Sequence, residues 1–447
     1  MTTDQIIERV RNSASNKVKV AVTDIDGILR GKYIHKNKFL SVIEGGFGFC
    51  DVVFGWDSSD VLYENSSFTG WHSGFPDAPA SIDLTTFREV PWDNDVPFFL
   101  ADFSKNNLDV CPRALLKKIN KQAKDSGYNA LFSQEYEWFN FEQSSVETHD
   151  NDFTKLNPIT RGMFGYSLLR ASEKSAFFND LFDLLEKFNV SLEGLHTETG
   201  PGVYEAAIGY GPILESADKS TLFKAAVKEI GHRHGIMPTF MAKWNAELPG
   251  SSGHIHQSLW DDKENLFFDE NDSNKMSDVM KSYIAGQLKC LPHLLPMYAP
   301  TVNSYKRLVE GAWAPTTITW GVDNRTTSLR ALPGSKNSTR LELRVPGADM
   351  NPYLAMSAAL ASGLYGVKNK LKLEIPATKE NGYTDKSNGV LPSTLQTATE
   401  KMKSSDLARE ILGEGFVNHF CETRDWEWKQ QTAVVTDWEL KRYFEII

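Results

Sequence analysis

Alternating polar and apolar residues mark a short strand at residues 340–344, which read Arg-Leu-Glu-Leu-Arg. Because successive side chains of a strand point to opposite faces, the three charged side chains would share one face, with the two leucines packed behind them. Such a face could hold a cation at its centre and anions at its flanks. It could equally belong to an exposed edge strand whose charges pair with one another. The pattern predicts a strand and leaves both interpretations open.

The beginning of the chain has the pattern of a small β-rich unit. Residues 17–34 predict two strands around a turn at Asp26-Gly27. Asp24 and Asp26 also have the spacing of a phosphatase-type aspartyl nucleophile. A hairpin turn favours Asp-Gly for conformational reasons alone, so the hairpin is the favoured interpretation.

A domain boundary is indicated near Asn106. A strand at 96–103 ends the β-rich unit, and a helix begins with Pro112 in its first turn. We therefore expect an N-terminal domain at 1–106 and a second domain at 107–447.

Several carboxylates and imidazoles of the second domain fall where strand geometry would gather them. Glu135 and Glu137 lie two apart on an apolar strand, so they point to one side and either repel each other or share cations, and cations are favoured. A Gly-Pro-Gly turn separates two further glutamates and could return both to one spot. Two histidines follow a Gly-Ser turn on an alternating strand and face one way, a normal metal or phosphate arrangement. These four residues are Glu198, Glu205, His254 and His256.

Apolar residues at helical spacing predict most of the remaining elements. Helices are expected at residues 177–188, 220–234, 282–293 and 353–367, and from Ser393 onward. Residues 301–315 are expected to form a loop with a Lys-Arg pair between aromatic residues.

Composition narrows the class of protein. With 447 residues, 41% of them hydrophobic, the chain can bury large cores and form two or more domains. It has no apolar run long enough to cross a bilayer and no secretory signal at its start, so a cytoplasmic location without a membrane partner is expected. The net charge of -10 and the lack of a basic block argue against a nucleic-acid partner. Four widely spaced cysteines show no metal or redox spacing and fit a reducing compartment.

The charged residues expected to face inward form an acidic and a basic group. The acidic group, with two histidines, comprises Glu135, Glu137, Glu198, Glu205, Glu342, His254 and His256. The basic group comprises Arg307, Arg325, Arg330, Arg340 and Arg344. Clustered carboxylates repel one another unless hard divalent cations such as Mg²⁺ or Mn²⁺ bind, and arginines call for anions. Because no Walker loop, nucleophile elbow or Cys-His pair is found, an ATP-dependent reaction fits better than hydrolysis.

Seven ordered motifs resemble the glutamine synthetase family over nearly the whole chain. They are QEYE, ETGPGVYE, SGHIHQSL, NSYKRL, NRTTSLR, RLELR and NPYLA. The resemblance implies an α+β fold, with an N-terminal β-grasp domain and a glutamine synthetase/guanido kinase-like catalytic domain built on a curved antiparallel sheet with helices. It also implies a homo-oligomer, a dodecamer of two stacked hexameric rings. Each active site would lie at a subunit interface, completed by the neighbour's N-terminal domain.

Carried over position by position, the same resemblance implies roles for individual residues. Glu137, Glu198 and Glu205 resemble the ligands of one metal, and Glu135, His254 and Glu342 those of the other. Gly250, Arg307 and Arg344 resemble the glutamate-binding residues, and His256, Ser258, Arg330 and Arg340 the ATP-binding residues. Arg325 resembles the group that faces the transferred phosphoryl. The implied reaction uses ATP, with two or more Mg²⁺ or Mn²⁺ ions per site, to convert glutamate to γ-glutamyl phosphate, from which an amine displaces phosphate.

The sequence departs from the family at the amine end of the site. Ammonia-using members carry a glutamate in text like NSYKRLVPGYEAP, where this chain has NSYKRLVEGAWAP with Trp313. Their Asp-Gly-Ser-Ser loop is also missing, and Asp51 is the nearest counterpart. Val203 and Pro249 stand where Gln and Asn are usual. An aromatic face suits an organic amine through apolar or cation–π contact, so Trp313 and Asp51 join Arg325 as the predicted catalytic residues.

The sequence therefore predicts a γ-glutamylamide synthetase that uses a polyamine, a monoamine or an aromatic amine. One alternative is a glutamine synthetase that uses ammonia with a variant flap. Another, from a different class, is a non-catalytic relative kept as a structural or regulatory ring.

Overall fold

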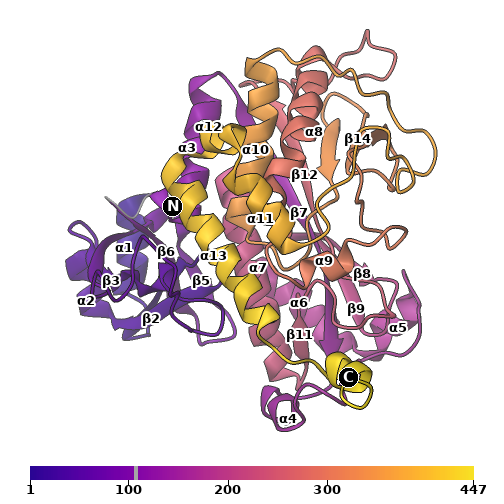
Figure 1. Cartoon of the computed structure of the whole chain (residues 1–447). Helices are drawn as coiled ribbons and strands as arrows, with labels where there is room; N and C mark the ends of the chain where they lie inside the picture. Colours follow the sequence, from indigo (N-terminus) through magenta and orange to yellow (C-terminus); the bar gives the residue numbers. More distant parts are fainter. Residues whose placement is uncertain (105–108) are drawn as a thin grey trace.

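A computed structural model describes residues 1–104 and 109–447, so the predicted boundary at Asn106 lies outside the described residues. Figure 1 shows the N-terminal residues, in indigo, as a unit beside the larger body. Its strands are β1 (Lys17–Thr23), β2 (Leu29–His35), β3 (Phe47–Cys50), β4 (Asp77–Ile82), β5 (Arg88–Val90) and β6 (Val96–Phe103). Its helices are α1 (Thr3–Arg11), α2 (Lys36–Val42), η1 (Asp51–Phe54) and η2 (Leu84–Thr86).

The N-terminal sheet has the order β2-β1-β6-β4-β3, with β5 paired to β6. β1 and β2 form the predicted antiparallel hairpin, while β1 and β6 run parallel. Val18, Val20 and Val22 alternate along β1 and are all buried in one core with Phe39 and Phe99. β-branched side chains at this spacing fill a pleated face, which is why the alternation predicts the strand.

A nine-stranded sheet forms the centre of the larger body, in the order β13-β14-β15-β12-β7-β9-β8, with β10 and β11 also paired to β7. Its first strands are β7 (Asn129–Phe141), β8 (Leu192–Thr197), β9 (Val203–Ile208), β10 (Gly211–Pro212) and β11 (Met237–Thr239). The others are β12 (Gly253–Trp260), β13 (Trp320–Val322), β14 (Leu329–Leu332) and β15 (Arg340–Leu343). Neighbouring strands are antiparallel except for the parallel pair β13–β14. β15 pairs with β12 on one side and β14 on the other, so the edge-strand interpretation of residues 340–344 is wrong.

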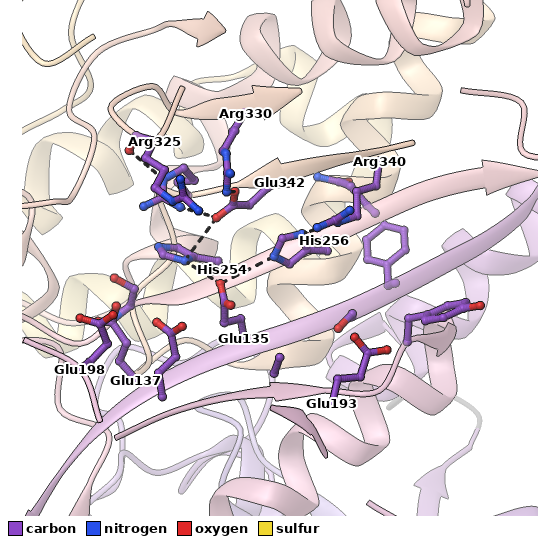
Figure 2. Close-up of a pocket in the computed structure, with 18 of the residues that line it drawn as sticks. Glu135, Glu137, Glu193, Glu198, His254, His256, Arg325, Arg330, Arg340 and Glu342 are labelled. Carbon is purple, nitrogen blue, oxygen red and sulfur yellow. Dashed lines mark hydrogen bonds and ion pairs between the residues drawn. The ribbon is translucent and has the colours of Figure 1, made fainter. Parts of the chain in front are cut away.

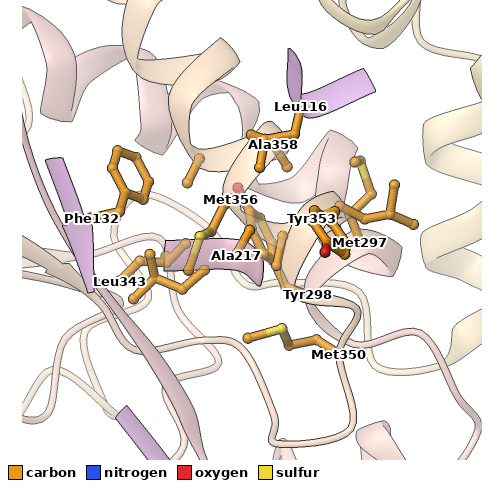
Figure 3. Close-up of a cluster of buried hydrophobic side chains, with 14 of the residues drawn as sticks. Leu116, Phe132, Ala217, Met297, Tyr298, Leu343, Met350, Tyr353, Met356 and Ala358 are labelled. Carbon is orange, nitrogen blue, oxygen red and sulfur yellow. The ribbon is translucent and has the colours of Figure 1, made fainter. Parts of the chain in front are cut away.

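Four long helices pack against this sheet: α3 (Pro112–Asp125), α7 (Ile213–Arg233), α8 (Asp278–Tyr298) and α10 (Pro352–Lys368). Figure 3 shows sheet residues Phe132 and Leu343 facing helix residues such as Tyr353 and Met356. α8 and α10 approach closely at glycines, because a Cβ at Gly366 would lie 2.0 Å from the Ser282 carbonyl oxygen. This helical layer buries the back of the sheet.

The remaining helices lie around these layers. They are α4 (Ser145–Asp150), α5 (Leu168–Glu173), α6 (Ser175–Lys187), α9 (Ser304–Arg307), α11 (Leu395–Lys403), α12 (Asp406–Leu412), α13 (Glu414–Thr432) and α14 (Asp437–Tyr443). The expected loop at 301–315 thus contains one helical turn, α9. No helix in the described ranges combines the length and apolarity needed to span a bilayer.

The turn at Asp24-Asp26 joins the two parts of the chain. Arg424 of α13 donates to Asp26 Oδ1 at 2.6 Å, and the Asn351 side chain donates to the backbone carbonyl of Asp24 at 3.3 Å. Asp24 accepts hydrogen bonds from the backbone N–H of Ile28 and from Arg30. Burial, together with Asp26, raises the pKa of the Asp24 carboxyl to about 7. The aspartates therefore stabilise the hairpin and its packing, in agreement with the favoured interpretation.

Candidate active site

A pocket of about 860 Å³ opens on the face of the nine-stranded sheet, a size within the range of small-molecule sites. It is lined from β7, β9, β12, β14 and β15 and by the loop that carries Trp313. Figure 2 shows Glu137 and Glu198 toward one end, Glu135, His254 and Glu342 near the centre, and His256 and Arg340 toward the other end.

The strand register explains the central group. His254 pairs with Glu135 across β12 and β7, and Glu342 of β15 is the neighbour of His256. His254 Nδ1 lies 3.2 Å from Glu135 Oε2 and 3.4 Å from Glu342 Oε1. The other imidazole nitrogen, Nε2, is buried without a hydrogen-bond partner among the described residues. The structure thus brings together the three predicted ligands Glu135, His254 and Glu342, with donor atoms within 4.8 Å of one another.

A second group of possible ligands comprises His196, Glu198 and Glu205. His196 Nε2 lies 3.1 Å from Glu205 Oε1. Glu137, predicted for this set, is paired with Glu205 across β7 and β9 and lines the pocket, but its Oε2 accepts a hydrogen bond from the Ser252 N–H at 2.7 Å. Sequence reasoning missed His196, although its position two residues before Glu198 in the same hairpin is a usable signal.

Electrostatics differ sharply between the two groups. Burial and the carboxylates of Glu135 and Glu137 raise the pKa of Glu205 to about 11. Burial also opposes ionisation of Glu135, but hydrogen bonds from His254 and His256 outweigh it and hold the pKa of its carboxyl well below the usual value. Hard oxygen and imidazole donors in this arrangement suit divalent cations, which would relieve the repulsion at Glu205.

Glu342 is the most enclosed carboxylate of the site, with 1% of its side chain exposed. It forms ion pairs with Arg330, at 2.9 Å, and with Arg344. Burial alone would raise its pKa, but the neighbouring side chains of His256, Arg344 and His254 lower it to about 2. Glu342 is therefore ionised at neutral pH and joins the arginines to the central ligand group.

The remaining predicted residues divide between the pocket and its surroundings. Gly250, His256, Ser258, Arg325, Arg330, Arg340, Arg344 and Trp313 line the pocket, as do Pro249 and Val203. Trp313 is 59% exposed and has a positive φ of 57°. Tyr166 also lines the pocket and packs against His196, with ring centroids 4.4 Å apart and ring planes tilted by 32°, a contact that sequence reasoning missed.

Two predicted residues, Arg307 and Asp51, are not among the residues that line the pocket in the described part of the chain. Arg307 is buried and donates to the Val345 carbonyl at 2.8 Å and to Ser252 Oγ at 3.0 Å, and burial lowers its pKa to about 10. Asp51 lies in the N-terminal unit, where its Oδ1 accepts a hydrogen bond from the Thr69 hydroxyl at 2.8 Å. Their roles toward substrate stay predictions.

Comparison with known proteins agrees with this geometry. A family model for the glutamine synthetase catalytic domain matches residues 109–443. The chain is 52% identical to type-1 glutamine synthetase 2 of Dictyostelium discoideum, over 99% of this chain and 86% of that protein. It is 36% identical to a glutamate–isopropylamine ligase of a Pseudomonas species, over 96% of this chain and 95% of the relative. A gamma-glutamylethanolamide synthetase of Streptomyces coelicolor is 34% identical, over 96% and 92%.

A solved structure described as a GmaS/ADP complex matches with a TM-score of 0.85 and 25% identity, covering 98% of this chain and 99% of that one. This likeness confirms the predicted α+β fold. The chain belongs to the glutamine synthetase family of ligases.

Proposed function

We propose that this protein joins the γ-carboxyl group of L-glutamate to an organic amine in an ATP-dependent reaction. The observation that carries the proposal is Trp313, an exposed aromatic side chain on the pocket wall at the position of the glutamate in ammonia-using members. An indole face contacts alkyl, polyamine or aromatic amines better than it binds ammonium, which is small and strongly hydrated. Two relatives support an organic acceptor, because one is named for isopropylamine and the other for γ-glutamylethanolamide.

The pocket residues divide the chemistry between them. In the first step, the glutamate γ-carboxylate attacks the terminal phosphorus of ATP, and ADP is the leaving group. In the second step, the amine nitrogen attacks the γ-carbonyl carbon, phosphate leaves, and the nitrogen loses a proton. Arg325 and Arg330 would neutralise phosphoryl oxygens, with Arg340 and His256 toward the nucleotide. Arg344 and the Gly250 backbone would orient glutamate. Bound Mg²⁺ or Mn²⁺ would supply charge neutralisation at the phosphoryl oxygens, held by the groups Glu135–His254–Glu342 and Glu198–Glu205 with His196 or Glu137.

Divalent metal is expected to raise the melting temperature of the protein. The raised pKa of Glu205 means that its carboxyl holds a proton in the folded protein, so a cation that binds there displaces this proton and stabilises only the folded state. A free metal concentration one hundred times the Kd would add about 2.7 kcal/mol of stability. Melting curves with EDTA, Mg²⁺ and Mn²⁺ measure this effect.

The Glu205→Gln variant should show a smaller metal-dependent shift than the parent protein. A surface control is Glu215→Gln, because Glu215 pairs with Lys219 at 2.8 Å on one face of α7. A full metal-dependent shift in Glu205→Gln would contradict the assignment of Glu205 as a ligand.

An amine panel tests the proposed function. Phosphate release is measured with glutamate, ATP and metal, and with ammonium, methylamine, isopropylamine, ethanolamine, a diamine, a polyamine or an aromatic amine, and each product is identified by mass. We expect at least one organic amine to exceed ammonium in kcat/KM by about tenfold or more, a difference of about 1.4 kcal/mol that one aromatic contact can supply. Ammonium outperforming every organic amine would overturn the proposal.

The second candidate is a glutamine synthetase that uses ammonia, favoured by the 52% identical Dictyostelium relative. In that case Trp313 would be a variant of the flap without a role in acceptor choice, and the amine panel decides between the two. Absence of metal-dependent ATP turnover with every amine and with ammonium would instead favour the non-catalytic ring.

The position of Asp51 supports an oligomeric assembly. Asp51 belongs to the N-terminal unit, for which we propose the range 1–106, whereas the pocket is formed by the proposed catalytic domain at 107–447. If Asp51 serves at the amine end, a neighbouring subunit must supply it. We propose the dodecamer of the family resemblance, and light scattering of the purified protein tests its mass.

A further inference from the structure

The segment that follows β15 lies beside the pocket wall, where Gly347 forms a bridge with Ser252, and Asp349 fixes it. Asp349 Oδ2 accepts hydrogen bonds from Ser304 Oγ at 2.5 Å and from Thr301 Oγ1 at 3.0 Å. The backbone on either side of Asp349 is held by Lys224 of α7, whose Nζ donates to the carbonyls of Ala348, at 2.8 Å, and Met350, at 3.1 Å. Asp349 thus connects a helix of the core layer to α9.

The charges of two basic side chains, Lys224 and Arg307, act on the Asp349 carboxyl. Its Oδ1 atom is buried without a hydrogen-bond partner in the described ranges. Burial raises the pKa of the Asp349 carboxyl, although the Ser304 hydroxyl and the cations of Lys224 and Arg307 oppose the shift. In turn, the negative charges of Glu137 and Asp349 favour the charged form of Arg307, which burial disfavours. The Asp349 side chain therefore anchors α9 through its hydrogen bonds with Ser304 and Thr301.

The single turn of α9 connects this anchor to the pocket wall. Ser304 and Arg307 are the first and last residues of α9, so fixing one end fixes the other. Arg307 packs directly beneath Gly250, where an added Cβ would lie 2.7 Å from Arg307 Cγ and 2.6 Å from the Ala242 carbonyl oxygen. A shift of α9 would therefore displace the pocket wall at Gly250.

The same turn leads into the loop that presents Trp313. The Val309 N–H donates to the Arg307 carbonyl at 2.8 Å, and the Ala312 N–H donates to the Val309 carbonyl at 3.1 Å. These two hydrogen bonds connect α9, through Val309, to the residue before Trp313. The position of Trp313 therefore depends on the position of α9.

We infer that Asp349 is a positioning residue for the glutamate end of the pocket, acting through Ser304 and Thr301 on α9 and thereby on Arg307 and Gly250. This inference rests on the proposed function for the identity of glutamate as the ligand. It concerns a carboxylate that is not among the pocket-lining residues of the described ranges, and it predicts that glutamate binding is weakened while ATP binding is spared.

The test compares Asp349→Ala, Asp349→Asn, Ser304→Ala and the Asp349→Ala/Ser304→Ala double variant. Glutamate binding is measured by calorimetry on the intact protein, and KM for glutamate and for ATP by phosphate release. Asp349→Ala should weaken glutamate binding by about tenfold or more while the KM for ATP changes by less than about threefold. Asn keeps an acceptor for both hydroxyls, so Asp349→Asn should recover much of the loss. Ser304→Ala should add little in the double variant, because both changes remove the same contact.

Asp385→Ala is the matched control. Asp385 accepts hydrogen bonds from the hydroxyls of Thr378, at 2.7 Å, and Ser387, at 2.6 Å, and is not among the residues that line the pocket in the described part of the chain. Asp385→Ala should leave glutamate binding unchanged.

The inference would be overturned by any of three results. These are equal weakening of glutamate and ATP binding, additive effects in the double variant, and parent-like glutamate binding in Asp349→Ala. If Asp349→Ala does not fold, the same comparison of glutamate binding with the KM for ATP is made in Asp349→Asn and Ser304→Ala. A negative amine panel with normal glutamate binding would overturn the proposed acceptor alone.

Discussion

Glu342→Gln is expected to reduce ATP-dependent turnover by roughly a hundredfold or more. The substitution preserves shape but removes the charge that pairs with Arg330 and Arg344 and that would bind metal beside His254. Because the side chain is 1% exposed, water cannot replace the lost charge. Leaving two arginines without this partner should also cost stability, on the order of 3–5 kcal/mol as in other broken buried pairs. Phosphate release with glutamate and the best acceptor measures the first effect, and urea denaturation the second.

Asp218→Asn separates the two effects. Asp218 is likewise buried and forms a two-pronged pair with Arg113, with both hydrogen bonds at 2.8 Å, outside the residues that line the pocket in the described ranges. We expect a comparable loss of stability with turnover retained by the folded fraction. Parent-like turnover in Glu342→Gln would contradict the proposed metal ligation. A parent protein without any turnover, whatever the acceptor, would point to the non-catalytic ring.

The strand at 340–344 shows what sequence pattern can and cannot predict. Alternation correctly placed its charged side chains on one face, because that depends only on the two-residue period of a strand. Whether β15 lies at an edge or in the middle of a sheet depends on β12 and β14, whose pairing is non-local. The motifs of distant segments, rather than the local pattern, were needed to favour the functional interpretation.

The direction of side chains outside regular strands was the feature of the site that the sequence predicted least well. The motif around Arg307 indicated a glutamate clamp, yet Arg307 is not among the pocket-lining residues of the described ranges, and its guanidinium donates to the Val345 carbonyl and to Ser252 Oγ. Periodicity does not apply to a one-turn helix, so no sequence pattern gave its direction. His196 was overlooked because only the glutamates of its hairpin were considered. The proposed role of Asp51 depends on a contact between two subunits, and such a contact leaves no pattern in the sequence of one chain.

The ends of the helices were predicted less accurately than their positions along the chain. The predicted helix at 282–293 is α8, Asp278–Tyr298, which continues through Pro292 and Pro296. Proline normally ends a helix, but both prolines are buried, and packing against α10 and α11 compensates for the lost backbone hydrogen bonds. Likewise α7 begins at Ile213, before the predicted 220, in a buried stretch where amphipathic periodicity is weak.

Trp313→Ala is expected to raise the KM for the organic amine by about tenfold, since one aromatic contact with a cationic or apolar amine contributes about 1–2 kcal/mol. The KM for ATP should change by less than about threefold, because the residues assigned to ATP, which are His256, Ser258, Arg330 and Arg340, lie on strands β12, β14 and β15. Trp313→Phe should retain most of the affinity. Initial rates with each substrate varied in turn measure these constants.

Phe153→Ala is a closely matched control for this change. Phe153 is 57% exposed and has a φ of 55°, against 59% and 57° for Trp313, so both substitutions remove an exposed aromatic side chain from a left-handed backbone position. Only the Trp313 change should affect the KM for the amine.

Trp313→Glu tests acceptor choice directly, because a carboxylate at this position can bind ammonium and accept its proton. The ratio of kcat/KM for amine over ammonium should then fall by about tenfold or more. An unchanged ratio in both Trp313→Ala and Trp313→Glu would mean that the acceptor is chosen elsewhere, and the proposal of an organic amine would lose its main support.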